Sequence, residues 1–337
     1  MKDIGLVGLP FSGRSTLFTA LTRTGSHGGQ ANHAVVPVPD PRLAVLTEME
    51  RSRKTVHAQV GFVDVLGGIS SAQGVARLRE TDALAIVLRC FGAEAGPVAD
   101  LAEVRAELLL SDQAVIEPAL AKAIKRARGK DTPEVDALRT ANDALGAEKP
   151  LSEGGLSEDE RAELKAIAPL TLKPSVVIAN VEEGTSVPAD LPEGTVGVYA
   201  SIEAETAEMD PQEARALLDE FGVHEPGLET VIRACYGALD LITFLTTGED
   251  ETRAWEVRRG ARAPEAAGAI HTDLERPGRR PAARDRRTRD RAPLFRRRGQ
   301  AGLRPRGGAR RSPPVRSSRD RTRGRQGDQA GSGQGHV

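Results

Sequence analysis

The sequence predicts an α/β fold in which helices cover the faces of a mostly parallel sheet. Two observations predict it: short apolar runs alternate with helical stretches, and a glycine-rich turn joins the first run to a helical stretch. The runs of strand length are Ile4–Gly8, Val60–Leu66, Ala83–Cys90, Val176–Asn180 and Val196–Ala200. Ligands of such sheets bind beyond the carboxyl ends of the strands, so the loops after these runs are the candidate functional segments.

The chain of 337 residues has a formal net charge of −1, but its charges are unevenly divided. Residues 1–275 carry 27 Lys and Arg against 44 Asp and Glu, whereas residues 276–337 carry 20 against 4. The chain begins "MKDIGLVGLP", with neither a leader pattern nor an apolar run of membrane-spanning length, which predicts a cytoplasmic chain with no membrane partner. Its two cysteines, Cys90 and Cys235, lie in apolar surroundings and are predicted to be buried thiols.

The basic segment after residue 275 contains no lysine and few bulky apolar residues, so it is predicted to be disordered. Two interpretations of this segment stay open. An arginine-rich tail can bind the phosphates of RNA or DNA without sequence preference, which would make nucleic acid a partner. Alternatively, its Arg, Pro, Gly and Ala content is what a GC-rich gene yields when it is read out of frame.

The strongest motif runs from Gly8 to Thr16 and fits G-x-x-x-x-G-[KR]-[ST] between a strand-like run and a helical stretch. Glycines let the backbone curl so that successive N–H groups converge on phosphates, and the helix N-terminus adds its dipole. Residue 14 can reach the outer phosphates, and the hydroxyl of residue 15 can bind Mg²⁺. The predicted nucleotide-binding residues of this loop are Gly8, Leu9, Pro10, Phe11, Ser12, Gly13, Arg14, Ser15 and Thr16.

A second segment, Asp64-Val-Leu-Gly67, ends the strand-like run "VGFVDVL". In nucleotide switches an aspartate at this place holds Mg²⁺, and the glycine N–H contacts the terminal phosphate. The predicted metal ligands are therefore Ser15 and Asp64, and Gly67 is a predicted nucleotide contact.

A third segment, "VVIANVEE", closes a buried-type strand with Asn180. Its side-chain amide can hold the base and support the phosphate loop, and an acid three residues later can contact the base edge. The predicted base-side residues are Asn180, Val181, Glu183, Ala200 and Ser201.

These segments and their spacing resemble the Obg-like ATPases of the YchF type. The resemblance is carried by "GLVGLPFSGRSTLFTALT", "VVPVPDPRL", "VGFVDVLGG", "KPSVVIANVEE" and a long run beginning "GLETVIRACYGALDLITFLTTGEDETRAWEVRRG", and it covers about residues 1–275. It implies a P-loop nucleoside triphosphatase that uses Mg²⁺ and ATP or GTP and associates with the ribosome or ribosomal RNA. The family's Asn-x-x-Glu, matched by Asn180 to Glu183, implies ATP rather than GTP. The reason is that the aspartate of GTPases, which accepts two hydrogen bonds from guanine, is missing.

The resemblance also implies a domain organisation. A doubly wound G domain covers residues 1–98 and 166–245, an α-helical hairpin is inserted over 99–165, and a truncated β-grasp (TGS) segment covers 246–275. The arginine-rich tail follows over 276–337. The hairpin is predicted from the residues as well, because apolar side chains recur at three-, four- and seven-residue steps. The family pattern stops within Leu274 to Arg276, in the middle of a domain, as a frameshift would produce.

The chain departs from the family pattern where that pattern supports hydrolysis. Arg14 replaces the lysine of the loop, and Gly68 stands where the family has an apolar residue. No threonine lies between Thr24 and Val35, and the stretch "FGAEAGPVADLAE" that begins with the last residue of "VLRCF" contains no histidine. We therefore expect nucleotide binding with weak hydrolysis and name no catalytic residue. The alternative is a degenerate protein that binds nucleotide or docks to the ribosome without hydrolysing.

Overall fold

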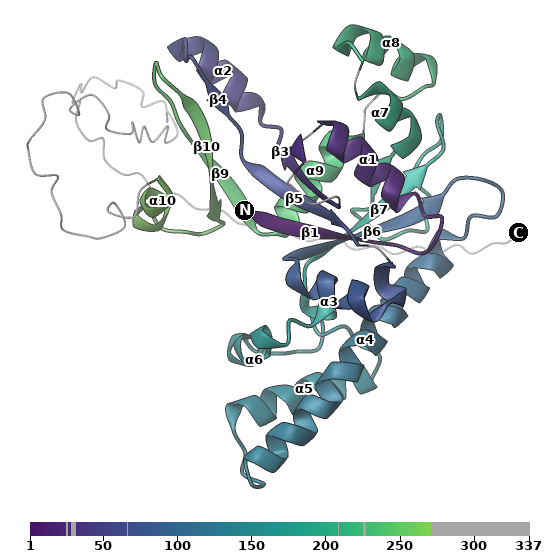
Figure 1. Cartoon of the computed structure of the whole chain (residues 1–337), viewed down its shortest axis with the longest axis vertical. Coiled ribbons are helices and arrows are strands. Elements are labelled where there is room, and N and C mark those ends of the chain that lie inside the picture. Colours follow the sequence, from purple (N-terminus) through teal and green to yellow (C-terminus); the bar gives the residue numbers. More distant parts are fainter. Residues whose placement is uncertain (25, 28–31, 66, 208, 225–226, 271–337) are drawn as a thin grey trace, which may run out of the picture. The chain divides into compact units, whose positions relative to one another are not determined.

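Figure 1 shows the chain as a computed structural model, which describes residues 1–24, 26–27, 32–65, 67–207, 209–224 and 227–270. The tail predicted to be disordered, residues 276–337, lies outside the described residues, as does the end of the predicted TGS-like segment. Within the described ranges, no helix is long and apolar enough to cross a membrane.

The central sheet contains β1 (Lys2–Val7), β2 (Ser26–His27), β3 (His33–Pro37), β5 (Gln59–Asp64), β6 (Ala83–Cys90), β7 (Ser175–Val181) and β8 (Val196–Val198). Their order is β2-β3-β5-β1-β6-β7-β8. The strands from β5 to β8 in this order run parallel, whereas β3 pairs antiparallel with β5 and β2 antiparallel with β3. The predicted α/β fold with a mostly parallel sheet is confirmed. The sequence did not predict β3, whose burial alternates along the strand as is typical near a sheet edge.

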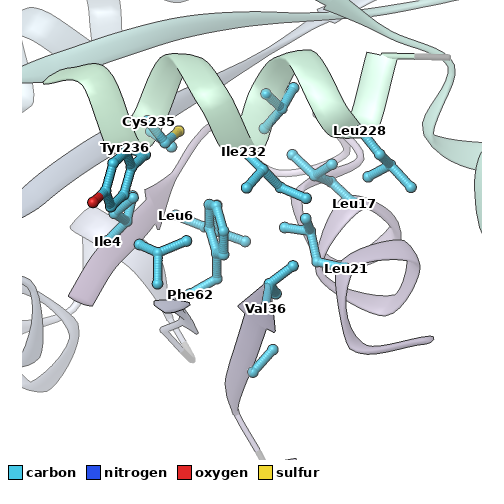
Figure 2. Packing of buried hydrophobic residues seen from close by; sticks show 14 of the residues in the cluster. Ile4, Leu6, Leu17, Leu21, Val36, Phe62, Leu228, Ile232, Cys235 and Tyr236 are labelled. Atoms are coloured by element: carbon cyan, nitrogen blue, oxygen red, sulfur yellow. The ribbon is translucent and has the colours of Figure 1, made fainter. Parts of the chain in front are cut away.

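Helices cover both faces of the sheet (Figure 1). On one face lie α1 (Arg14–Thr24), α7 (Ala200–Thr206) and α9 (Gly227–Ala238), and on the other lie α3 (Ala72–Glu80) and α4 (Pro97–Arg126). Figure 2 shows the first face, where Leu17 and Leu21 of α1 cluster with Ile232 of α9 and Phe62 of β5. Burying each such side chain contributes about 1.5–3 kcal/mol. This packing holds the N-terminus of α1 at the end of β1.

The inserted segment forms an antiparallel helix pair from α4 and α5 (Pro133–Gly146), followed by α6 (Glu158–Glu163). The N-terminal part of α4 packs on the sheet through residues such as Val104, while Ile116 further along packs with Leu138 of α5. At the start of α5, the Thr132 hydroxyl accepts a hydrogen bond from the Val135 N–H at 3.3 Å, a helix cap that fits the Thr-Pro pair in the sequence. The boundaries 99 and 165 stay a prediction.

A second sheet contains β4 (Thr55–Val56), β10 (Thr252–Arg258) and β9 (Leu241–Thr246) in that order. β9 and β10 form an antiparallel pair in which Phe244 stacks on Trp255, with ring centroids 6.5 Å apart. α10 (Ala263–Ile270) contacts β10. The remaining elements are α2 (Pro41–Glu50), α8 (Pro211–Glu220) and the short 3-10 helices η1 (Gly68–Ser70), η2 (Leu164–Ala166) and η3 (Leu170–Leu172).

A buried carboxylate joins α7 to α9 on the first face of the sheet. Glu203 is 3% exposed and accepts hydrogen bonds from the N–H groups of Tyr199 (3.0 Å), Gly227 (2.8 Å) and Leu228 (2.8 Å). The last two N–H groups belong to the first turn of α9, which has no intrahelical acceptors for them. Burial raises the pKa of Glu203, and the three backbone hydrogen bonds offset this only in part.

Because the folded-state pKa of Glu203 is raised above its ordinary value of 4.5, the folded chain holds this proton more tightly than the unfolded chain does. The contribution of Glu203 to the free energy of unfolding is therefore complete below about pH 4.5, the ordinary value that applies to the unfolded chain. It declines as the pH rises through the folded-state pKa. We expect the stability difference between the native chain and Glu203→Gln to shrink over this interval, as measured by urea denaturation at several pH values. The exposed neighbour on the same helix supplies the control, Glu205→Gln, which should show no such trend. A difference that stays constant or grows with pH contradicts the prediction.

Candidate nucleotide site

The glycine-rich loop lies between the end of β1 at Val7 and the start of α1 at Arg14. It forms one wall of a pocket of about 430 Å³, and the segment after β5 forms the other wall. The lining residues are Gly8, Leu9, Pro10, Phe11, Ser12, Gly13, Arg14, Ser15, Thr16, Gly67, Gly68, Ile69 and Ser70. The structure therefore brings all nine predicted loop residues together with Gly67. Gly68, Ile69 and Ser70 were missed, although their position directly after the Asp64-to-Gly67 segment was a signal for them.

Two positions of the loop accept only glycine because other groups approach the backbone closely. A Cβ on Gly8 would lie 2.6 Å from the carbonyl oxygen of Val87, and a Cβ on Gly13 would lie 2.0 Å from Nδ2 of Asn180. Gly13 also has φ +83°, in the left-handed region that strains other residues. The loop thus lies tightly against β6 and β7.

Asn180, at the end of β7, is buried and uses both ends of its amide within the protein. Its Nδ2 donates to the carbonyl oxygen of Ser12 at 3.2 Å, and its Oδ1 accepts from the N–H of Ala200 at 3.2 Å. This side chain therefore ties the loop to the start of α7. Of the other predicted base-side residues, Val181, Glu183, Ala200 and Ser201 are all described, and none lines the pocket with the loop.

Arg14 is the one charged residue among the described residues that line the pocket, and it forms an ion pair with Asp64 at the end of β5. Arg14 Nε lies 2.8 Å from Asp64 Oδ1, and Ser15 Oγ donates to Asp64 Oδ2 at 3.0 Å. The Arg14 and Asp64 side chains are 18% and 12% exposed. A Cβ on Gly68 would lie 2.6 Å from Arg14 Nη1, so the guanidinium reaches across the pocket to the opposite wall.

The predicted metal ligands are adjacent, but their arrangement does not fit Mg²⁺. The single negative charge of Asp64 is already matched by Arg14, and the Ser15 hydroxyl donates to the same carboxylate. A divalent cation would have to approach this neutral pair beside the Arg14 guanidinium. In the described part of the chain, no three His, Cys, Asp or Glu side chains are grouped so that they could hold a metal ion. His33, one of the histidines before β5, pairs instead with Asp3, with 3.0 Å between Nε2 and Oδ1.

Phe11 is the strained residue of the loop, since it has φ +66° and an 85% exposed side chain. The left-handed conformation costs a non-glycine residue about 1–2 kcal/mol, and asparagine tolerates it better than phenylalanine does. We expect Phe11→Asn to raise the free energy of unfolding by about 1 kcal/mol. Urea denaturation measures this change. The matched control is Phe221→Asn, another exposed phenylalanine but with φ −85°, which should bring no gain; a Phe11→Asn chain no more stable than the native one contradicts the prediction.

A mostly parallel sheet whose first strand leads through this loop into a helix defines the P-loop nucleoside triphosphatase class. The comparisons with known proteins narrow the class. The chain is 37% identical over 309 residues to the ribosome-binding ATPase YchF of Escherichia coli O157:H7. The alignment covers 81% of this chain and 85% of that protein. The chain is 34% identical over 312 residues to the protein of the same name from Bacillus subtilis, with the same two coverages. The chain therefore belongs to the YchF family.

The structure and a family model agree with this membership. The solved structure of the Schizosaccharomyces pombe YchF GTPase matches with a TM-score of 0.69 and 25% identity, over 81% of this chain and 85% of that one. The family model described as YchF-GTPase_C, protein of unknown function, matches residues 241–280, a range that begins with β9. The resemblance stated from the sequence is confirmed.

Proposed function

We propose that this chain is a P-loop protein that binds purine nucleotides, hydrolyses them slowly and associates with the ribosome. The observation that carries the proposal is the pocket of about 430 Å³ between the loop Gly8–Thr16 and the segment Gly67–Ser70. Its wall contains the N-terminus of α1, where free N–H groups and the helix dipole favour phosphate. The names of the relatives from Escherichia coli and Bacillus subtilis support the ribosome as partner, which would place the chain in the cytoplasm.

The base side supports ATP as the preferred nucleotide. Asn180 and Glu183 replace the Asn-Lys-x-Asp of GTPases, so the aspartate that accepts two hydrogen bonds from guanine is missing. In the proposal Asn180 acts by holding the loop against β7, because both ends of its amide are engaged there. Val181, Glu183, Ala200 and Ser201 would flank the base beyond the loop.

The lining of the pocket supports slow hydrolysis. Among the described residues that line it, none carries a carboxylate, an imidazole or an amide side chain that could orient an attacking water. Arg14 keeps a positive charge at the place of the family lysine, so phosphate binding is retained in the proposal. No step of the proposed binding depends on Mg²⁺, for which the sequence predicted Ser15 and Asp64 as ligands.

Titration of the full-length chain with fluorescent ATP and GTP analogues tests the binding proposal. We expect saturable binding of both, tighter for ATP. A phosphate-release assay on the same preparation then tests turnover, which we expect to be slow but above that of a Gly13→Ala chain, whose loop is disrupted. Undetectable affinity for both analogues overturns the proposed function, and tight binding with no release leaves the alternative of a non-hydrolysing nucleotide-binding protein.

Sedimentation with ribosomes through a sucrose cushion tests the partner. We expect the native chain to sediment with ribosomes and to remain in the supernatant without them. A second chain that ends at residue 275 separates the contribution of the arginine-rich tail. Co-sedimentation that requires the tail supports a tail that binds RNA, and equal co-sedimentation assigns the contact to residues 1–275. Absence of both chains from the ribosomal pellet overturns the ribosome as partner.

A further inference from the structure

The feature of the pocket that the proposed function does not use is the position of the Arg14 guanidinium between its two walls. One edge of the group, at Nε, lies 2.8 Å from Asp64 Oδ1. The other edge reaches Gly68, where a Cβ would lie 2.6 Å from Nη1. Gly68 and Arg14 both line the pocket, so the group links the carboxylate at the end of β5 to the place where the loop would hold phosphates.

A divalent cation in P-loop proteins bridges the same two partners. It neutralises the carboxylate after the strand and the negative charge of the outer phosphates. A guanidinium can do both, because it is always charged and presents five N–H donors on two edges in a planar fork. An ammonium ion has three donors on one compact nitrogen but lacks the planar fork, so it cannot present paired N–H groups to partners on two opposite sides.

We propose that the Arg14 guanidinium stands in for a divalent cation beside Asp64, so that this chain binds nucleoside triphosphates as metal-free anions. The inference rests on the proposed function, since it assumes that the pocket takes nucleotide. Nε forms the ion pair with Asp64, and the Nη edge donates two parallel hydrogen bonds to oxygens of the outer phosphates. The guanidinium then occupies the place of Mg²⁺ beside Asp64, so adding Mg²⁺ does not strengthen binding.

Two further contacts agree with this role. Ser15, whose hydroxyl would otherwise bind a cation, donates to Asp64 Oδ2 at 3.0 Å and so holds the carboxylate in place for Arg14. Residue 68 has no side chain, and any Cβ there would meet the guanidinium at 2.6 Å. The glycine after the Asp64-to-Gly67 segment and the arginine of the loop are therefore matched in space, although they are 54 positions apart in the sequence.

Isothermal titration of the full-length chain with ATP tests the inference, in buffer with saturating Mg²⁺ and in buffer with excess EDTA. For the native chain we expect the two affinities to agree within about threefold. For Arg14→Lys we expect chelation to weaken binding at least about tenfold, because the ammonium lacks the two-edged fork that faces both Asp64 and the phosphates. The control variant is Arg42→Lys, which changes an arginine that pairs with Asp40 outside the pocket and should behave as the native chain does.

The outcomes separate the two proposals. Binding by the native chain that weakens more than threefold on chelation overturns the metal-free inference and leaves the proposed function standing. The same response to chelation in the native and Arg14→Lys chains overturns it too. No binding under either condition overturns both proposals. Because the native chain alone supplies the first test, the inference stays falsifiable even if Arg14→Lys does not fold.

Discussion

Gly13→Ala is expected to weaken nucleotide binding at least about a hundredfold. The new Cβ would lie 2.0 Å from Asn180 Nδ2, and that amide cannot turn away without losing its hydrogen bonds to Ser12 and Ala200. The φ of +83° adds strain at the same position. Both effects displace the loop N–H groups that would converge on the phosphates. Titration with a fluorescent ATP analogue measures the loss, and circular dichroism checks that the variant is folded.

Gly129→Ala is the matched control for Gly13→Ala. Gly129 has a similar φ of +74°, but no atom lies within 4 Å of the place where its Cβ would stand. Its alanine variant carries the conformational strain without the contact to Asn180, and it should bind nucleotide as the native chain does. A Gly13→Ala chain that is folded and binds within about threefold of the native affinity contradicts the loop geometry as the basis of the site.

Asp112→Ala is expected to lower the free energy of unfolding by about 3–5 kcal/mol. Asp112 of α4 is completely buried, and its carboxylate accepts from the Leu170 N–H (2.8 Å), the Thr171 N–H (2.7 Å) and the Thr171 hydroxyl (2.8 Å). Arg79 of α3 pairs with the same carboxylate at 2.7 Å. Alanine would leave the arginine charge and two N–H groups without their acceptor in a place with little water, which is the costly way to break such a network.

Urea denaturation measures this loss, with Asp131→Ala as its control. Asp131 also pairs with an arginine, Arg139, but its side chain is 72% exposed, so its removal should leave stability unchanged within error. Asp112→Asn keeps one oxygen acceptor and should fall between the native chain and Asp112→Ala. If the Asp112→Ala chain is as stable as the Asp131→Ala chain, this hydrogen-bond network does not stabilise the packing of α3, α4 and η3, and the prediction is wrong.

The candidate site was predictable where neighbours in the sequence are also neighbours in space. The loop from Gly8 to Thr16 is a continuous segment between a strand and a helix, so its motif was sufficient to place it. The pairing of Arg14 with Asp64 was not predictable. It depends on which strand lies beside β1 in the sheet, and on the absence of a side chain at residue 68. From the sequence alone Ser15 and Asp64 were predicted as metal ligands, and the structure adds that they contact each other and that Arg14 lies beside Asp64.

The same division holds for the fold. The apolar runs of β1, β5, β6 and β7 predict buried parallel strands, because a strand covered on both faces has little room for polar residues. The two-residue strand β4 pairs with β10, which lies almost 200 positions later in the sequence. No local sequence pattern predicts a pairing made by so few residues. Likewise, Asp112 and Glu203 look like surface acids in their helices, and they are buried only because α3 and η3 in one case and α9 in the other bring donors to them.

Local patterns in the chain were thus enough to establish the fold class, the phosphate loop and the family. The loop motif and strand runs are set by backbone conformation and hydrophobic burial, which act between near neighbours. Which charges pair, which acids are buried and which group lies beside Asp64 were decided when distant segments came together. Electrostatic contacts depend on distances between atoms far apart in the sequence, and these distances exist only in the folded chain.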